Sequence, residues 1–106
     1  MEYKVNREGG VLTLSLTGEL DHHGAASART SLDREIRLAA PKKVVLELSQ
    51  VHFCDSSGLG LIMGRYRCAT AAGAAFAVKD PSPAVERIMA LAGLGKIIKT
   101  ERSVKI

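Results

Sequence analysis

The alternation of apolar and polar residues predicts a strand over residues 11–20. In VLTLSLTGEL, three leucines fall on one face, and threonine and serine residues fall on the other. This pattern is typical of a half-buried strand. A shorter strand is predicted at residues 3–6, and Gly9 and Gly10 between the two are typical of a turn. We therefore expect the chain to open with an antiparallel hairpin.

Helical periodicity follows in three segments, in which apolar residues recur at three- and four-residue steps. The first runs from about residue 25 to residue 40. Pro41 ends the first segment, and the second begins after Phe53 and ends at Gly73. The third begins with Ser82 as N-cap and Pro83 at the first helical position, and Gly93 ends it. Val85, Ile88, Met89 and Leu91 supply the apolar side of the third helix.

Between these helices lie apolar runs that predict buried strands at residues 44–48 and 74–79, with a short last strand at residues 96–99. Strands that alternate with helices imply parallel pairing through right-handed crossovers. The predicted fold class is therefore α/β. We expect a single domain over residues 1–106, with a small mixed sheet, the N-terminal antiparallel hairpin and packed helices.

Composition and charge narrow the function classes. Aromatic residues make up 4% of the 106 residues and tryptophan is absent, so we expect no aromatic platform for single-stranded nucleic acid. The net charge is +4, with short basic clusters at residues 42–43, 65–67 and 96–105. We interpret these clusters as solvated surface and expect no direct nucleic-acid partner.

Features of secretion and membrane insertion are not seen in the sequence. The N-terminus has no apolar signal region, and no apolar run is long enough to span a bilayer. Cys54 and Cys68 lack CxxC spacing, so we interpret them as reduced thiols that belong to the core. We expect a cytoplasmic protein that needs no cofactor and has no membrane partner.

The segment CDSSGLGLIMGRY, residues 54–66, joins a strand to a helix and holds more capping residues than one helix needs. Asp55, Ser56 and Ser57 are all favourable N-caps, and one cap contributes about 1 kcal/mol. At least one hydroxyl is therefore left for another role. A serine at a helix start suits phosphorylation, because the positive end of the helix favours the added charge. Such a phosphate would act on a docked partner more than on folding.

Two glycines in the same helix are also unusual. Gly60 and Gly64 are spaced by four and share a helix face, although each costs a helix interior about 1 kcal/mol relative to alanine. One interpretation is tight packing of the helix on the sheet. The other is a bare helix face against which a partner can press. The sequence leaves both open.

Asp21, His22 and His23 gather a carboxylate and two imidazoles at another strand-to-helix turn. Adding His52 and Cys54 gives a possible set of zinc ligands, but their spacing matches no zinc motif. Asp21 could instead cap the helix that follows it. A small serine hydrolase using one of the two serines and a histidine is a further alternative, although the G-x-S-x-G motif is absent.

Two segments together resemble the signatures of a known family. TGELDHH at residues 17–23 and DSSGLGLIMGRY at residues 55–66 resemble those of the STAS-domain anti-sigma factor antagonists. KDPSPAVERIMALAGLGKII, residues 79–98, is similar to the third helix and closing segment of the family. The match is closest to the sporulation type, which acts on the forespore sigma factor F. The resemblance implies a small mixed sheet flanked by helices.

The resemblance also implies a partner switch rather than an enzyme. An ATP-dependent serine kinase, itself the anti-sigma factor, would phosphorylate Ser56, the first serine after the aspartate. The unphosphorylated domain would bind the anti-sigma factor and release sigma factor F, and a PP2C-type phosphatase would restore it after phosphorylation. A general-stress antagonist of another sigma factor is the alternative. The expected partner-binding residues are Asp21, Asp55, Ser57, Gly58, Gly60 and Gly64.

Overall fold

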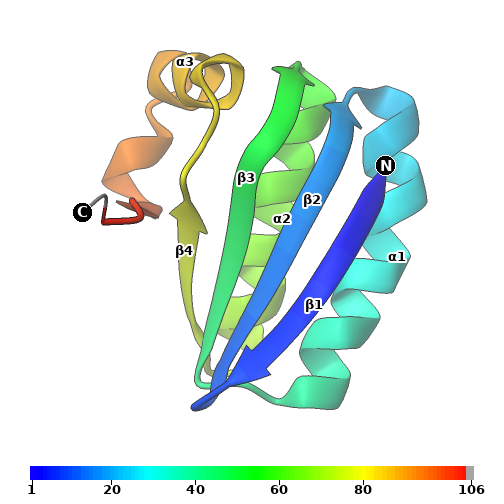
Figure 1. Cartoon of the computed structure of the whole chain (residues 1–106), viewed down its shortest axis with the longest axis vertical. Coiled ribbons are helices and arrows are strands. Elements are labelled where there is room, and N and C mark those ends of the chain that lie inside the picture. Colours follow the sequence, from blue (N-terminus) through cyan, green and yellow to red (C-terminus); the bar gives the residue numbers. More distant parts are fainter. Residues whose placement is uncertain (105–106) are drawn as a thin grey trace.

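The computed structural model describes residues 1–104, which form a five-stranded sheet with the strand order β1-β2-β3-β4-β5 (Figure 1). The strands are β1 (Glu2–Glu8), β2 (Val11–Leu20), β3 (Lys43–Cys54), β4 (Ala75–Lys79) and β5 (Lys99–Glu101). β1 pairs with β2 antiparallel, and the other neighbouring strands pair parallel. The predicted α/β class, mixed sheet and N-terminal hairpin are confirmed.

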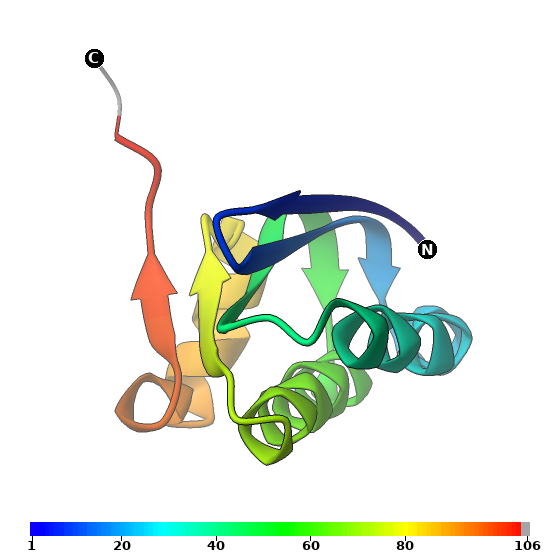
Figure 2. The same cartoon turned by 90° about the horizontal axis from the view of Figure 1, so that it is seen from below.

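The helices are α1 (His22–Ala39), α2 (Ser56–Ala71) and α3 (Pro83–Leu91), and a short 3-10 turn, η1 (Leu94–Lys96), follows α3. α1 and α2 lie side by side across one face of the sheet (Figure 2), whereas α3 packs near the end of β3 (Figure 1). The core lies between the sheet and the α1–α2 pair. Its fully buried members include Leu12, Leu14, Leu16, Leu32, Ile36, Leu46 and Ile62.

β1 spans Glu2–Glu8 rather than residues 3–6, and two other elements depart from the prediction for a clear reason. β3 continues to Cys54 instead of ending near residue 48, because its polar stretch around Ser49 and Gln50 still pairs with β2 across an irregularity in register. α1 begins at His22 rather than at Ala25, because the Asp21 side chain caps it.

The C-terminal third also differs from the prediction. The last strand is Lys99–Glu101 instead of residues 96–99. Residues 94–96 form η1, and Ile98 is buried in the core before the strand begins. Leu91, predicted on the apolar side of α3, is 81% exposed, so that prediction is wrong. α3 ends at this residue, beyond the reach of the core.

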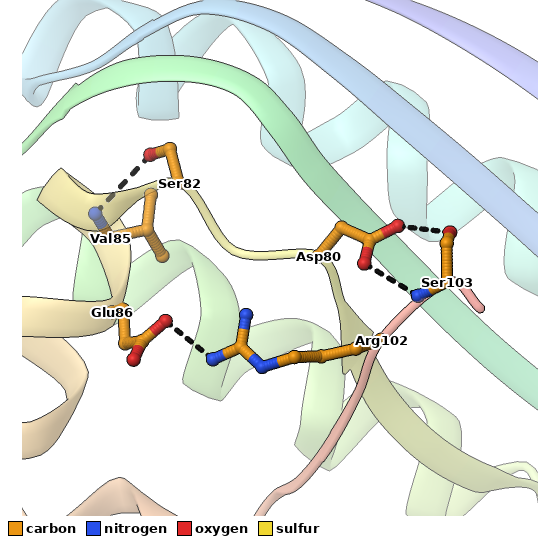
Figure 3. Close-up of polar contacts among 6 residues, drawn as sticks. All are labelled: Asp80, Ser82, Val85, Glu86, Arg102 and Ser103. Carbon is orange, nitrogen blue, oxygen red and sulfur yellow. Dashed lines mark hydrogen bonds and ion pairs between the residues drawn. The ribbon is translucent and has the colours of Figure 1, made fainter. Parts of the chain in front are cut away.

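The predicted start of α3 is confirmed. The Ser82 hydroxyl oxygen accepts the backbone N–H of Val85 at 3.4 Å, and Pro83 occupies the first turn (Figure 3). The same hydroxyl donates to the carbonyl oxygen of Val51 in β3. The cap residue therefore also ties α3 to the sheet.

The segment after β5 is held by polar contacts on the exposed surface. The Asp80 carboxylate accepts the backbone N–H of Ser103 at 2.7 Å and also its hydroxyl (Figure 3). Arg102 Nη2 lies 2.5 Å from Glu86 Oε2 on α3. These contacts attach residues 102 and 103 to α3 and to the residue that follows β4.

Candidate functional site

The two segments that carry the family resemblance meet at the carboxyl ends of β2 and β3. β2 and β3 run parallel, and their last residues, Leu20 and Cys54, pair in register. The backbone N–H of Asp55 donates to the carbonyl oxygen of Leu20 at 3.2 Å. α1 and α2 therefore begin next to each other. We call residues 21–29 and 55–64 the junction site.

Aspartates cap both helices of the junction site. Asp55 Oδ1 accepts the backbone N–H groups of Ser57 at 2.8 Å and Gly58 at 3.3 Å. Asp21 Oδ1 accepts the backbone N–H of Gly24 at 2.8 Å. The capping interpretation of Asp21 is thus confirmed, and at the second junction the cap is Asp55. Neither serine hydroxyl is needed as a cap.

The two serines differ in their surroundings. Ser56 is the first residue of α2 and is exposed, whereas Ser57 is half-buried and faces α1 across a groove. An exposed hydroxyl reaches the active site of another protein more readily than a half-buried one. The position of Ser56 therefore suits a phosphate acceptor better than that of Ser57. Its phosphorylation remains a prediction.

The glycines of α2 separate into two kinds. A Cβ added at Gly58 would lie 2.5 Å from Cys54 Sγ and 2.6 Å from the carbonyl oxygen of Leu20, so this glycine permits close packing of α2 on the strand ends. A Cβ at Gly60 or Gly64 would meet no atom within 4 Å. The tight-packing interpretation is therefore wrong for Gly60 and Gly64. It holds for Gly58, which the sequence did not single out for packing.

A groove of about 330 Å³ runs between α1 and α2 at the junction site. Its lining residues are His22, Ala25, Ala26, Arg29, Ser57, Gly60 and Leu61. The floor is made of small or apolar side chains, and the polar members come from both helices. The predicted partner-binding residues Ser57 and Gly60 line this groove. Gly58 is buried against the ends of β2 and β3, and its contact with a partner stays a prediction, as do those of Asp21, Asp55 and Gly64.

Arg65 is a buried charge that the sequence analysis missed. It belongs to a cluster interpreted as solvated surface, yet its side chain is only 4% exposed. Its Nε lies 2.8 Å from Asp33 Oδ1 on α1, and its Nη2 donates to Oδ2 at 3.4 Å. Burial lowers the pKa of Arg65 and Asp33 opposes that shift, so the guanidinium stays charged. Arg65 follows buried Leu61 by four residues and so lies on the same helix face. This spacing is a signal from which its burial could have been predicted.

Cys54 lies at the junction and is a free, half-buried thiol. Its Sγ donates to the carbonyl oxygen of Asp55 at 3.6 Å. Burial, with a smaller contribution from the Asp55 charge, raises the pKa of this thiol from 9.0 to about 11. Burial also raises the pKa of Cys68, which lies near Asp33. Both thiols are therefore protonated and weakly nucleophilic at neutral pH.

We expect Cys54 to react slowly with a thiol reagent in the folded protein at pH 8. In a Cys68→Ser variant, the thiolate fraction of Cys54 should be lowered by roughly a hundredfold relative to the unfolded chain. Reaction with Ellman's reagent, with and without urea, measures this. Because the folded pKa is raised, the thiol stabilises the fold below pH 9, and this contribution is lost as pH rises toward 11. Equal rates with and without urea would contradict the shift.

Two alternatives from the sequence concern other classes of site. Within residues 1–104, no three histidine, cysteine, aspartate or glutamate side chains come together in a way that could hold a metal ion. His22 and His23 are both exposed. None of the helices formed within that part of the chain combines the length and apolar character that crossing a membrane requires.

Comparison with known proteins agrees with this geometry. Residues 2–105 match the STAS domain family. An anti-sigma F factor antagonist from Paenibacillus polymyxa is 39% identical over 98 residues, which cover 92% of this chain and 84% of that protein. The solved structure of the anti-sigma factor antagonist SpoIIAA in its unphosphorylated form has a TM-score of 0.80 at 27% identity, over 98% of this chain and 90% of that one.

A second solved structure, the Bacillus cell fate determinant SpoIIAA in the phosphorylated form, has a TM-score of 0.74 at 26% identity and covers 98% of this chain and 93% of its own. The family match spans nearly the whole chain, and the 39% identical relative is covered over most of its length. The chain therefore belongs to the STAS-domain anti-sigma factor antagonists.

Proposed function

We propose that this protein is a binding module of the sigma factor F system that is switched by phosphorylation of Ser56. The unphosphorylated form binds an anti-sigma factor that is also an ATP-dependent serine kinase, and thereby releases sigma factor F. Phosphorylation by that kinase ends the complex, and a PP2C-type phosphatase restores the binding form. The names of the relatives support the choice of sigma factor F over a general-stress sigma factor. We place this exchange in the cytoplasm.

The observation that carries the proposal is the free, exposed hydroxyl of Ser56 at the first position of α2. Asp55 caps the helix, so no folding role holds this hydroxyl in place. SpoIIAA, a relative of similar fold, has been solved in both an unphosphorylated and a phosphorylated form. A switch at the start of α2 is consistent with that pair of structures.

A phosphate at this position would change binding more than stability. It would bring about −1.5 to −2 charges to an exposed site, where the positive end of α2 favours them and Asp55 opposes them. The folded chain keeps the phosphate in water. A docked partner would have to desolvate it, which is costly for a charged group. The added charge therefore weakens the complex.

The partner surface that we propose is the exposed side of the junction site. Gly60 and Gly64 leave the α2 surface bare, and Ser57 borders it. Asp21 begins α1 beside this surface. Asp55 and Gly58 hold α2 in place behind this surface. Asp55 caps α2, and Gly58 lets α2 pack closely on the strand ends.

Phosphorylation by the purified anti-sigma factor kinase tests the site. With ATP, tandem mass spectrometry is expected to find phosphate on Ser56 in the wild type and in Ser57→Ala, and none in Ser56→Ala. Phosphate on Ser57 would correct the site and keep the switch. An unmodified protein, with a kinase active on another substrate, would refute the proposed regulation.

Binding measurements test the switch itself. Ser56→Ala is expected to bind the anti-sigma factor like the wild type, because it removes only an exposed hydroxyl. Ser56→Asp should bind at least about tenfold more weakly, because it places a charge in the interface. Labelling of Ser56 or Ser57 by broad serine-hydrolase probes, lost on His22→Ala, would favour the enzyme alternative instead.

A further inference from the structure

Arg29 is a cation without a partner in the groove between α1 and α2. Its neighbour one turn along α1 is Asp33, at the i+4 position where an acidic side chain ordinarily pairs with it. Asp33 instead directs both carboxylate oxygens at Arg65, at 2.8 Å and 3.4 Å. Within residues 1–104, Arg29 forms no ion pair.

Asp33 cannot pair with Arg29 without giving up its ion pair with Arg65. The Arg65 side chain is only 4% exposed, and a protein is strongly destabilised when a buried guanidinium loses its carboxylate. Arg29 lies near enough to Arg65 to help lower its pKa, and Asp33 pairs with Arg65 rather than with Arg29. Within the part of the chain that the structure describes, Arg29 is therefore left without a carboxylate of its own beside the groove.

The groove beside Arg29 has room for a side chain from another protein. It encloses about 330 Å³, and Ala25, Ala26 and Gly60 supply only small groups to its walls. Its other polar groups are the Ser57 hydroxyl and the His22 ring. The carboxylates of Asp21 and Asp55, at the helix starts nearby, already accept backbone N–H groups. A cation that lines a small-walled groove suits a carboxylate better than an apolar or basic side chain.

We propose that this groove receives an acidic side chain of the anti-sigma factor and that Arg29 binds it. The inference rests on the proposed function and deepens it. It also gives the switch a direct physical cause: Ser56 lies next to Ser57 of the groove, so a phosphate there repels the incoming carboxylate. The same partner carboxylate is then attracted by Arg29 of α1 and repelled by a phosphate on Ser56 of α2.

The test uses the full chain with the Ser56→Ala substitution, so that phosphorylation cannot change the complex during measurement. Four variants, Arg29→Glu, Arg29→Ala, Arg29→Lys and Arg34→Glu, are compared with this parent by calorimetric titration of the anti-sigma factor. Arg34 is the matched control, because it is an exposed arginine of α1 outside the groove. Circular dichroism checks that each variant is folded.

Arg29→Glu is expected to weaken the complex at least tenfold, whereas Arg29→Lys and Arg34→Glu should stay within about threefold of the parent. The affinity of the parent should also fall more steeply with added salt than that of Arg29→Ala. Unchanged affinity of folded Arg29→Glu, or an equal loss in Arg34→Glu, would overturn this inference and leave the proposed function standing. A parent that does not bind the anti-sigma factor would overturn both.

Discussion

Replacing Asp33 by alanine is expected to lower the free energy of unfolding by about 3 kcal/mol. The substitution leaves the Arg65 guanidinium, only 4% exposed, without the carboxylate that compensates its burial. Asp33 itself is 25% exposed, so water can enter the space of the missing side chain. This solvation keeps the loss at the lower end of the range for broken buried ion pairs.

Urea denaturation of the wild type and of Asp33→Ala measures the loss. The control is Glu35→Ala, which removes another ion pair of α1, to Arg7 of β1, whose side chain is 56% exposed. That substitution should change the free energy of unfolding by less than about 1 kcal/mol. Adding Arg65→Met to Asp33→Ala should recover much of the stability, because an apolar chain replaces an unpaired charge. Equal midpoints for Asp33→Ala and Glu35→Ala would contradict the role of the buried pair.

The order of elements could be predicted because it depends on local periodicity. The leucines of β2 alternate with polar residues, and the apolar residues of α1 recur at helical steps, so each segment shows its own buried face. The end of β3 could not be predicted in this way. Ser49 and Gln50 interrupt the apolar run, but Gln50 pairs with Thr17 in a strand that is distant in the sequence.

The candidate site was predicted only in part for a similar reason. Its location followed from the capping residues at the start of α2, which are a local signal. Which residue caps depends on side-chain geometry, and Asp55 leaves both serines free. The pairing of Arg65 with Asp33, and hence the free charge of Arg29, depends on how α1 packs against α2. A single sequence carries no signal for that contact beyond the helical spacing.

Two alanine substitutions only two residues apart in α2 should change stability in opposite directions. Gly58→Ala is expected to lower the free energy of unfolding by about 3 kcal/mol, because its Cβ would lie 2.6 Å from the Leu20 carbonyl oxygen and 2.5 Å from Cys54 Sγ. The backbone of β2 cannot move away without breaking its pairing with β3. Gly60→Ala is expected to raise it by about 1 kcal/mol, because its Cβ meets nothing within 4 Å and alanine favours the helix.

The same pair separates stability from partner binding. Urea denaturation measures the first, and titration with the anti-sigma factor measures the second. If the bare face of α2 is a partner surface, Gly60→Ala should be the more stable protein and yet the weaker binder, since its new methyl group enters the groove that Gly60 lines. A Gly60→Ala protein that gains stability and keeps full affinity would show that the glycine serves no contact. Partner binding would then not explain why this helix has a destabilising glycine at position 60.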